Sequence, residues 1–171
     1  MKLLLTGPPG IGKTTVIQKV LQGIDLTAGG FFTQEMRKGG RRVGFSVKTL
    51  DGKEGVLAHI DYKGRYRVGR YGVNVSLFEA MALPELETSL RGKELIVIDE
   101  IGKMELFSQR FRKMVKQILD QEERHLLGVI HYGREPFVAS IKKRRDVDVI
   151  SVTSANRDGL PSQIIMRLQK R

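Results

Sequence analysis

Residues 3–15, which read LLLTGPPGIGKTT, decide the fold of this chain. Three leucines closed by glycine and proline are typical of a short buried strand that ends in a turn. From Lys13 to Leu21 the apolar residues recur at helical spacing, which predicts a helix directly after the turn. The turn itself, from Gly7 to Thr14, matches the pattern G-x-x-x-x-G-K-[ST] at every fixed position. A strand, this loop and a helix in that order predict a phosphate-binding loop.

The composition limits what kind of protein this is. A length of 171 residues predicts a single domain, spanning residues 1–171. A domain of this size can bury a stable hydrophobic core without disulfide or metal cross-links. The absence of cysteine excludes disulfides, iron–sulfur clusters, thiolate zinc sites and thiol nucleophiles. No apolar run approaches about 18 residues, so we expect no membrane partner and a cytoplasmic location. The 30 basic and 19 acidic residues give a formal net charge of +11, which could match nucleic acid, phosphorylated small molecules or no partner at all.

Strands and helices are predicted to alternate along most of the chain. Apolar runs predict strands, and helical spacing predicts helices, in this order: strand 94–99, helix 107–119, strand 126–131, helix 136–143, strand 147–152 and helix 160–168. Further helices are expected at residues 76–81 and, separately, after Pro84. Glycine pairs between apolar runs at residues 30–60 indicate antiparallel hairpins. The pattern predicts an α/β fold, with a mainly parallel sheet flanked by helices and a β-hairpin insertion at about residues 30–70.

The phosphate loop has the residue types that its chemistry requires. Glycines let successive backbone N–H groups turn inward toward phosphate oxygens, and the following helix points its positive end at the same place. Lys13 is then placed to reach the β- and γ-phosphates, the Thr14 hydroxyl to bind Mg²⁺, and Thr15 to contact the α-phosphate. The predicted nucleotide-binding residues are Gly7, Pro8, Pro9, Gly10, Ile11, Gly12, Lys13, Thr14 and Thr15. The alternative, a glycine-rich turn that binds nothing, leaves the order of strand, loop and helix unexplained.

Two carboxylates, Asp99 and Glu100, close the most apolar predicted strand. Ligands of an open parallel sheet lie outside the carboxyl ends of its strands, so both groups should face the phosphate loop. We expect Asp99 to hold Mg²⁺ together with Thr14, in the manner of a Walker B carboxylate. Glu100 is then placed to orient and deprotonate a water aimed at the γ-phosphorus. The predicted catalytic residues are therefore Glu100, which acts on the water, and Lys13, which reaches the β- and γ-phosphates. The alternative is that Glu100 is a solvated turn residue or an ion-pair partner of Lys103.

Residues after other predicted strands are weaker candidates. His131 ends one strand, where it could sense the γ-phosphate or only close a strand-end hydrogen bond. Thr33 and Glu35 follow an apolar pair and could reach the site, although ordinary hairpin side chains have the same pattern. Asn156 and Arg157 follow the last predicted strand, in a loop that could contact the nucleobase or only cap the last helix.

Residues 97–105, which read VIDEIGKME, resemble the signature of a small nucleoside-triphosphatase family first described from thermophiles, which has a human cancer-related relative. Three further segments resemble that family's other motifs in the same order: GPPGIGKTT at 7–15, GGFFTQE at 29–35 and VTSANRD at 152–158. The resemblance implies Mg²⁺-dependent hydrolysis of ATP, GTP and other nucleoside triphosphates, with little base selectivity. It also implies a RecA-like sheet in which a further strand lies between the phosphate-loop strand and the Asp99 strand. The site residues that it carries over are Asp99, Glu100 and Lys103.

Two other functions fit parts of the sequence. A P-loop kinase for a nucleotide or another hydroxyl compound would use the same loop. The sequence has no evident arginine-rich lid over an acceptor, although the three arginines at residues 65–70 could be mistaken for one. A nucleic-acid-binding ATPase would use the ten Lys and Arg of residues 37–70 and the basic run at residues 142–145. Tyrosines interleaved with the first group could stack on bases, namely Tyr62, Tyr66 and Tyr71. A solvated, charged hairpin face is the simpler interpretation.

Overall fold

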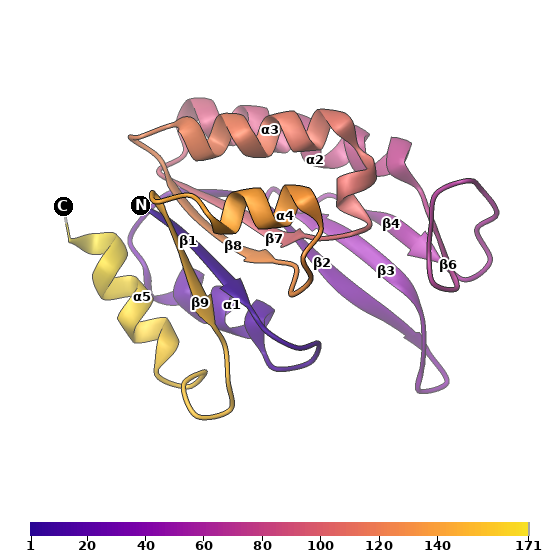
Figure 1. Cartoon of the computed structure of the whole chain (residues 1–171), viewed down its shortest axis with the longest axis horizontal. Helices are drawn as coiled ribbons and strands as arrows, with labels where there is room; N and C mark the ends of the chain where they lie inside the picture. Colours follow the sequence, from indigo (N-terminus) through magenta and orange to yellow (C-terminus); the bar gives the residue numbers. More distant parts are fainter. Residues whose placement is uncertain (171) are drawn as a thin grey trace.

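The structure, a computed structural model, describes residues 1–170 and contains one continuous sheet with helices packed on both faces (Figure 1). Its strands are β1 (Lys2–Thr6), β2 (Ala28–Lys38), β3 (Arg41–Thr49), β4 (Glu54–His59), β5 (Arg67–Val68), β6 (Tyr71–Val73), β7 (Leu95–Ile101), β8 (His125–Ile130) and β9 (Val147–Ser151). Its helices are α1 (Lys13–Gly23), α2 (Val75–Gly92), α3 (Gln109–Asp120), α4 (Pro136–Lys142) and α5 (Leu160–Gln169), with a 3₁₀ turn at Glu105–Phe107. The α/β class expected from the sequence is confirmed.

The phosphate-loop strand and the Asp99 strand belong to a parallel half of the sheet. The described strands follow the order β5-β6-β4-β3-β2-β7-β8-β1-β9. β8 lies between β1 and β7 and pairs in parallel with both, so it is the further strand that the family resemblance implies. β9 pairs in parallel with β1, and β2 with β7. These five strands run in the same direction, and the loops that follow them therefore gather at one edge of the sheet.

The hairpin insertion extends the same sheet and makes it mixed. The first residues of β2, 28–32, pair in parallel with β7, and the strand then continues in antiparallel pairing with β3. The strands β4, β6 and β5 follow by further antiparallel pairing. Phe32 is paired with Asp99, so Thr33 comes one residue beyond the level of that carboxylate. The insertion is thus joined directly to the strand that ends in the candidate carboxylates, and Figure 1 shows its long β2–β3 arm projecting from the helical layers.

Side chains of the central strands alternate between two hydrophobic cores. On β7, Leu95 and Val97 enter a core closed by α1 and α5. Ile96 and Ile98 enter the other core, which is closed by α2 and α3. All four are fully buried, which explains why this run has no polar position. A slip of one residue would exchange the two sets, so burial determines where Asp99 leaves the sheet.

One long helix, α2, replaces the two short helices expected around Pro84. Pro84 lies inside this helix, where it has no N–H to donate to the carbonyl of Ala80. The helix continues because its other face is buried, with Phe78, Ala82 and Leu86 at most 1% exposed, while Pro84 itself faces solvent. The expectation of a break is wrong here because tertiary packing outweighs one lost hydrogen bond.

The other predicted helices and parallel strands agree with the structure to within two residues at each end. The start of α3 shows why such small differences arise. Ser108 caps this helix by accepting the N–H of Phe111 at 2.9 Å, and the residues just before it form the 3₁₀ turn. Within residues 1–170, no helix is both long and apolar enough to cross a membrane.

Candidate functional site

The loop between β1 and α1 takes the shape that its glycines predict. Gly10 and Gly12 have φ angles of 76° and 107°, a region that residues with side chains rarely adopt. Gly12 directly precedes α1, and its carbonyl accepts the N–H of Val16 at 3.0 Å. The first turn of α1 therefore opens onto the loop, where its N–H groups and the helix dipole favour an anion.

Side chains from the two main motifs meet at the mouth of this loop. Thr14 Oγ1 donates a hydrogen bond of 2.5 Å to Asp99 Oδ2. Lys13 Nζ donates to the carbonyls of Gly7 and Pro8, at 2.9 Å each, so the ammonium lies over the loop. The start of α1 and the end of β7 thus come together as the strand-end rule predicts.

Asp99 is buried, and its pKa is altered as a result. The residue is 3% exposed, and burial raises the pKa of Asp99 to about 7, against the opposing effect of the hydrogen bond from Thr14. A hydroxyl and a carboxylate side by side are hard oxygen ligands of the kind that Mg²⁺ takes, usually with water and substrate phosphates as the other ligands. The described residues contain no cluster of three or more His, Asp or Glu suited to a metal. The pair therefore fits a phosphate-associated Mg²⁺ and not an all-protein cage.

Two carboxylates, of Glu100 and Glu105, converge on Gly102. A Cβ added at Gly102 would lie 2.8 Å from Glu100 Oε1 and 3.0 Å from Glu105 Oε2, so both side chains use the space that a larger residue would fill. Glu105 is 5% exposed, and burial, followed by the negative charge of Glu100, raises the pKa of Glu105 well above its ordinary value. The peptide bond between Asp99 and Glu100 is cis. Glu105 is a site residue that sequence reasoning missed, although it belongs to the same signature as Glu100.

His131 links Glu100 to a further acidic residue. His131 Nδ1 lies 3.5 Å from Glu100 Oε1, and His131 Nε2 lies 3.4 Å from Glu135 Oε1. Lys103 Nζ lies 3.5 Å from the same oxygen of Glu135. Lys103 thus pairs with Glu135, and the alternative of a Glu100–Lys103 ion pair does not hold. Lys142 steadies this loop from α4 by donating to the carbonyl of His131 at 2.8 Å.

Of the two candidates that follow β9, Arg157 reaches the phosphate loop and Asn156 does not. Arg157 Nη1 donates to the carbonyl of Ile11 at 3.4 Å. Asn156 holds its own loop together, because Oδ1 accepts the N–H of Thr153 and Nδ2 donates to the carbonyl of Ser151, at 2.8 Å each. The amide of Asn156 is thus engaged within the loop, and α5 begins after Gly159 without a side-chain cap.

A groove of about 620 Å³ runs from the phosphate loop to the hairpin insertion. Its inner end is lined by the glycine loop together with Lys13, Thr14, Thr15, Asp99, Glu100, Lys103, Glu105 and His131. Its outer end is lined by the insertion through Thr33, Gln34, Glu35, Arg42, Phe45, Leu57 and Val68, and also by Met104. Thr33 and Glu35, which the sequence suggests only weakly, therefore do line the site.

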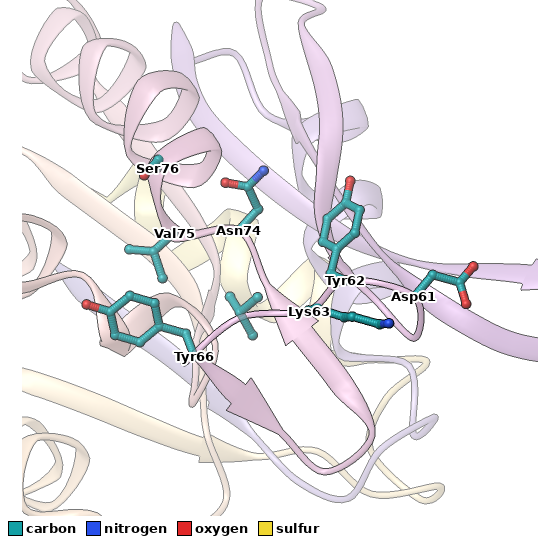
Figure 2. A pocket seen from close by; sticks show the side chains of 8 residues that line it. Asp61, Tyr62, Lys63, Tyr66, Asn74, Val75 and Ser76 are labelled. Atoms are coloured by element: carbon teal, nitrogen blue, oxygen red, sulfur yellow. The ribbon is translucent and has the colours of Figure 1, made fainter.

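A second cavity, of about 380 Å³, lies beside the loop between β4 and β5. Figure 2 shows Tyr66 and Val75 on one side of it and Tyr62 on the other, with Asp61 and Lys63 pointing outward. Its lining shares no residue with the groove and includes neither the glycine loop nor a carboxylate pair. The groove is therefore the candidate site.

Several basic residues of the insertion are tied to partners within the chain. Glu35 forms ion pairs with Arg37 at 2.8 Å and with Arg42 at 2.9 Å. Tyr71 is 6% exposed, and its hydroxyl accepts from Arg42 and Arg70. A buried ring cannot stack on a base, so Tyr71 is excluded as a base-stacking residue in the nucleic-acid hypothesis.

The strand, the glycine loop that opens onto a helix, and the buried carboxylate at the end of a parallel strand together define a P-loop nucleotide-binding protein. A family model described as NTPase matches residues 2–165. The chain belongs to this NTPase family, in agreement with the resemblance in its four motifs.

Relatives match the chain along nearly its whole length. It is 46% identical to the nucleoside-triphosphatase THEP1 of Thermotoga maritima, over 99% of this chain and 96% of that protein. It is 43% identical to the cancer-related nucleoside-triphosphatase of Homo sapiens, over 98% of this chain and 96% of that protein. The crystal structure of THEP1 from Aquifex aeolicus matches with a TM-score of 0.92 at 37% identity, covering 99% of this chain and 100% of that chain. The likeness therefore includes both the phosphate loop and the insertion.

Proposed function

We propose that this chain hydrolyses nucleoside 5'-triphosphates to the diphosphate and phosphate in a Mg²⁺-dependent reaction. The observation that carries the proposal is the contact between the Thr14 hydroxyl and the Asp99 carboxylate at the mouth of the glycine loop. Glu100, the next residue on β7, brings a second carboxylate to the same place. The name nucleoside-triphosphatase, carried by relatives from bacteria and from Homo sapiens, supports the same activity.

The loop and α1 bind the triphosphate. Backbone N–H groups of residues 7–12 and the N-terminal end of α1 cradle the phosphate oxygens. Lys13 already lies over the loop, and its ammonium donates to the β- and γ-phosphates in place of the loop carbonyls. Mg²⁺, with Thr14 and Asp99 as its protein ligands, would neutralise negative charge on the same two phosphates.

Glu100 activates the attacking water. Its carboxylate orients a water toward the γ-phosphorus and takes up the proton as the new oxygen–phosphorus bond forms. His131, 3.5 Å from Glu100, restrains that carboxylate from the end of β8 and is placed to respond to the γ-phosphate. The carboxylate of Glu105 lies near that of Glu100, because a Cβ at Gly102 would approach both.

Broad base tolerance follows from how the nucleotide is held. The inner end of the groove is lined by groups that suit phosphates, and their contacts with the phosphates are the same for every nucleoside triphosphate. Asn156, the side chain best suited to read a base edge, has both its amide nitrogen and its amide oxygen engaged within its own loop. We therefore expect ATP, GTP and other nucleoside triphosphates to be substrates.

Phosphate release from ATP, GTP, CTP and UTP, with Mg²⁺ and with a chelator, tests this function. We expect all four to be hydrolysed with Mg²⁺ and none with the chelator. Lys13→Ala should lose both nucleotide binding and turnover, because it removes the charge that faces the β- and γ-phosphates. Lys19→Ala, at an exposed position of the same helix, is the matched control. Wild-type turnover by Lys13→Ala would contradict the site, and hydrolysis of a single nucleotide would contradict the base tolerance.

A further inference from the structure

The groove extends beyond the place where a water would attack. Lys13 and Thr14 direct the β- and γ-phosphates toward Asp99 on β7, and β2 is the next strand on that side. Phe32 of β2 is level with Asp99, and the groove continues from Thr33 onward along the insertion. Its outer half therefore lies past the γ-phosphate, on the side away from the phosphate loop. Hydrolysis needs only the inner half and one water, so the outer half has no part in that reaction.

One wall of this outer half is a flat, polar surface that the fold holds in place. Arg42 Nε donates to the hydroxyl of Tyr71, and Arg42 Nη1 donates to Glu35 Oε1, at 2.9 Å each. The guanidinium carbon lies 5.2 Å from the ring centroid of Phe45 and 5.6 Å from that of Tyr71. Within residues 1–170 no group accepts from Arg42 Nη2, which leaves one donor edge for a ligand. Glu35 supplies acceptor oxygens beside it.

Apart from Thr33 and Gln34, the remaining residues of the outer half are apolar. Phe45, Leu57, Val68 and Met104 are the apolar residues that line it. Such a surface suits a planar ring whose edge carries hydrogen-bonding groups. Arg42 is already paired with Glu35, so its positive charge is balanced within the chain. The negative charge of Glu35 therefore disfavours an acceptor that carries a phosphate group of its own.

We propose that the outer half of the groove binds a nucleoside, whose sugar hydroxyl replaces water as the acceptor of the γ-phosphoryl group. This inference rests on the proposed function, because both reactions use the same phosphate loop and carboxylates. A bond forms between the hydroxyl oxygen and the γ-phosphorus, and the bond from that phosphorus to the β,γ-bridging oxygen breaks. The hydroxyl proton passes to the carboxylate of Glu100, as the proton of water does in hydrolysis. The products are a nucleoside monophosphate and a nucleoside diphosphate.

Transfer of label from ATP labelled at the γ-phosphate tests the proposal. The full chain is incubated with Mg²⁺ and, separately, with adenosine, guanosine, cytidine, uridine and thymidine, and labelled products are separated. We expect at least one labelled nucleoside monophosphate, with a matching fall in labelled inorganic phosphate. Labelled inorganic phosphate as the sole product with all five nucleosides would overturn the acceptor site and leave the hydrolase standing. Absence of any labelled product would contradict the hydrolase as well.

Substitutions that fill the outer half of the groove test whether this part of the groove binds the acceptor. Val68→Trp should lower labelled monophosphate at least about tenfold relative to labelled inorganic phosphate, because the indole occupies the outer half. Val75→Trp places the same side chain in the second cavity and should keep the wild-type ratio (Figure 2). Glu35→Gln, at a half-exposed position, should raise the KM for the nucleoside and provides the readout if Val68→Trp does not fold. A wild-type ratio in the folded variants, or a raised KM for ATP alone in Val68→Trp, would overturn the proposal.

Discussion

Three carboxylates, of Asp99, Glu100 and Glu105, crowd the end of β7, and their exposure to water differs. Asp99 and Glu105 are 3% and 5% exposed, whereas the side chain of Glu100 is 32% exposed. A group that activates water must be able to touch it, and a metal ligand gains from a dry setting. The difference in burial therefore supports the proposed assignment of water activation to Glu100 and of metal binding to Asp99.

The raised pKa of Asp99 predicts a distinct pH dependence of stability. The ordinary value is 3.8 and the folded value about 7, so between these pH values the unfolded chain has released a proton that the folded chain keeps. Stability from this group is lost as the pH rises from about 4 to about 7. Asp99→Asn cannot ionise, so without Mg²⁺ it should gain up to about 4 kcal/mol over the wild type by pH 8, relative to their difference at pH 4.

Urea unfolding of both proteins at several pH values in metal-free buffer measures this effect. A free-energy difference between Asp99→Asn and wild type that stays constant from pH 4 to pH 8 would contradict the buried, neutral carboxyl. Added Mg²⁺ should stabilise the wild type more than the variant, since the ion favours the ionised carboxylate.

A substitution at Gly102 tests whether the position of the Glu100 carboxylate matters for turnover. Gly102→Ala places a Cβ within 3.0 Å of the carboxylates of Glu100 and Glu105, and the flexible ends of those side chains must move. We expect kcat to fall at least about tenfold with little change in KM, because a displaced base no longer aligns the water. Gly92→Ala, where a Cβ meets nothing within 4 Å, is the matched control. Equal kcat for the two variants would show that the crowding at Gly102 has no catalytic role.

At the scale of elements, α2 keeps a proline that its stability does not need. Pro84 faces solvent and leaves the carbonyl of Ala80 without its helical partner. Pro84→Ala should restore that bond and raise the free energy of unfolding by about 2 kcal/mol, after allowance for the greater freedom of the unfolded chain. Urea unfolding checks the gain, with Glu87→Ala on the exposed face as control. A loss of stability would mean that Pro84 has a packing role that its exposure does not reveal.

The elements differ in how well the sequence predicts them. The central strands are predictable because a strand buried on both faces must be apolar throughout, as Leu95 to Ile98 are. The continuity of α2 across Pro84 is not predictable from local preference, because it depends on which residues the sheet buries. Pairing of β2 with both β7 and β3 depends on register between distant segments, and no local pattern contains it.

At the scale of the whole molecule, the sheet joins the insertion to the phosphate loop. The strand-end rule brings Thr14 and Asp99 together from sequence alone, and it also places His131 near them. The crowding around Gly102 and the pairing of Lys103 with Glu135 arise from loop conformations that the sequence pattern does not encode. The excess positive charge is engaged in part within the chain, so its presence does not by itself call for nucleic acid.

The central claim is that Glu100 activates water for attack on a nucleotide held by the phosphate loop. Single-turnover phosphate release by Glu100→Gln, with nucleotide affinity measured on the same protein, tests it most directly. We predict a rate at least about 10²-fold below wild type with unchanged affinity for the nucleoside triphosphate, because Gln cannot take up the proton. Glu87→Gln, at an exposed position of α2, should behave as wild type. Wild-type phosphate release by Glu100→Gln would contradict the account.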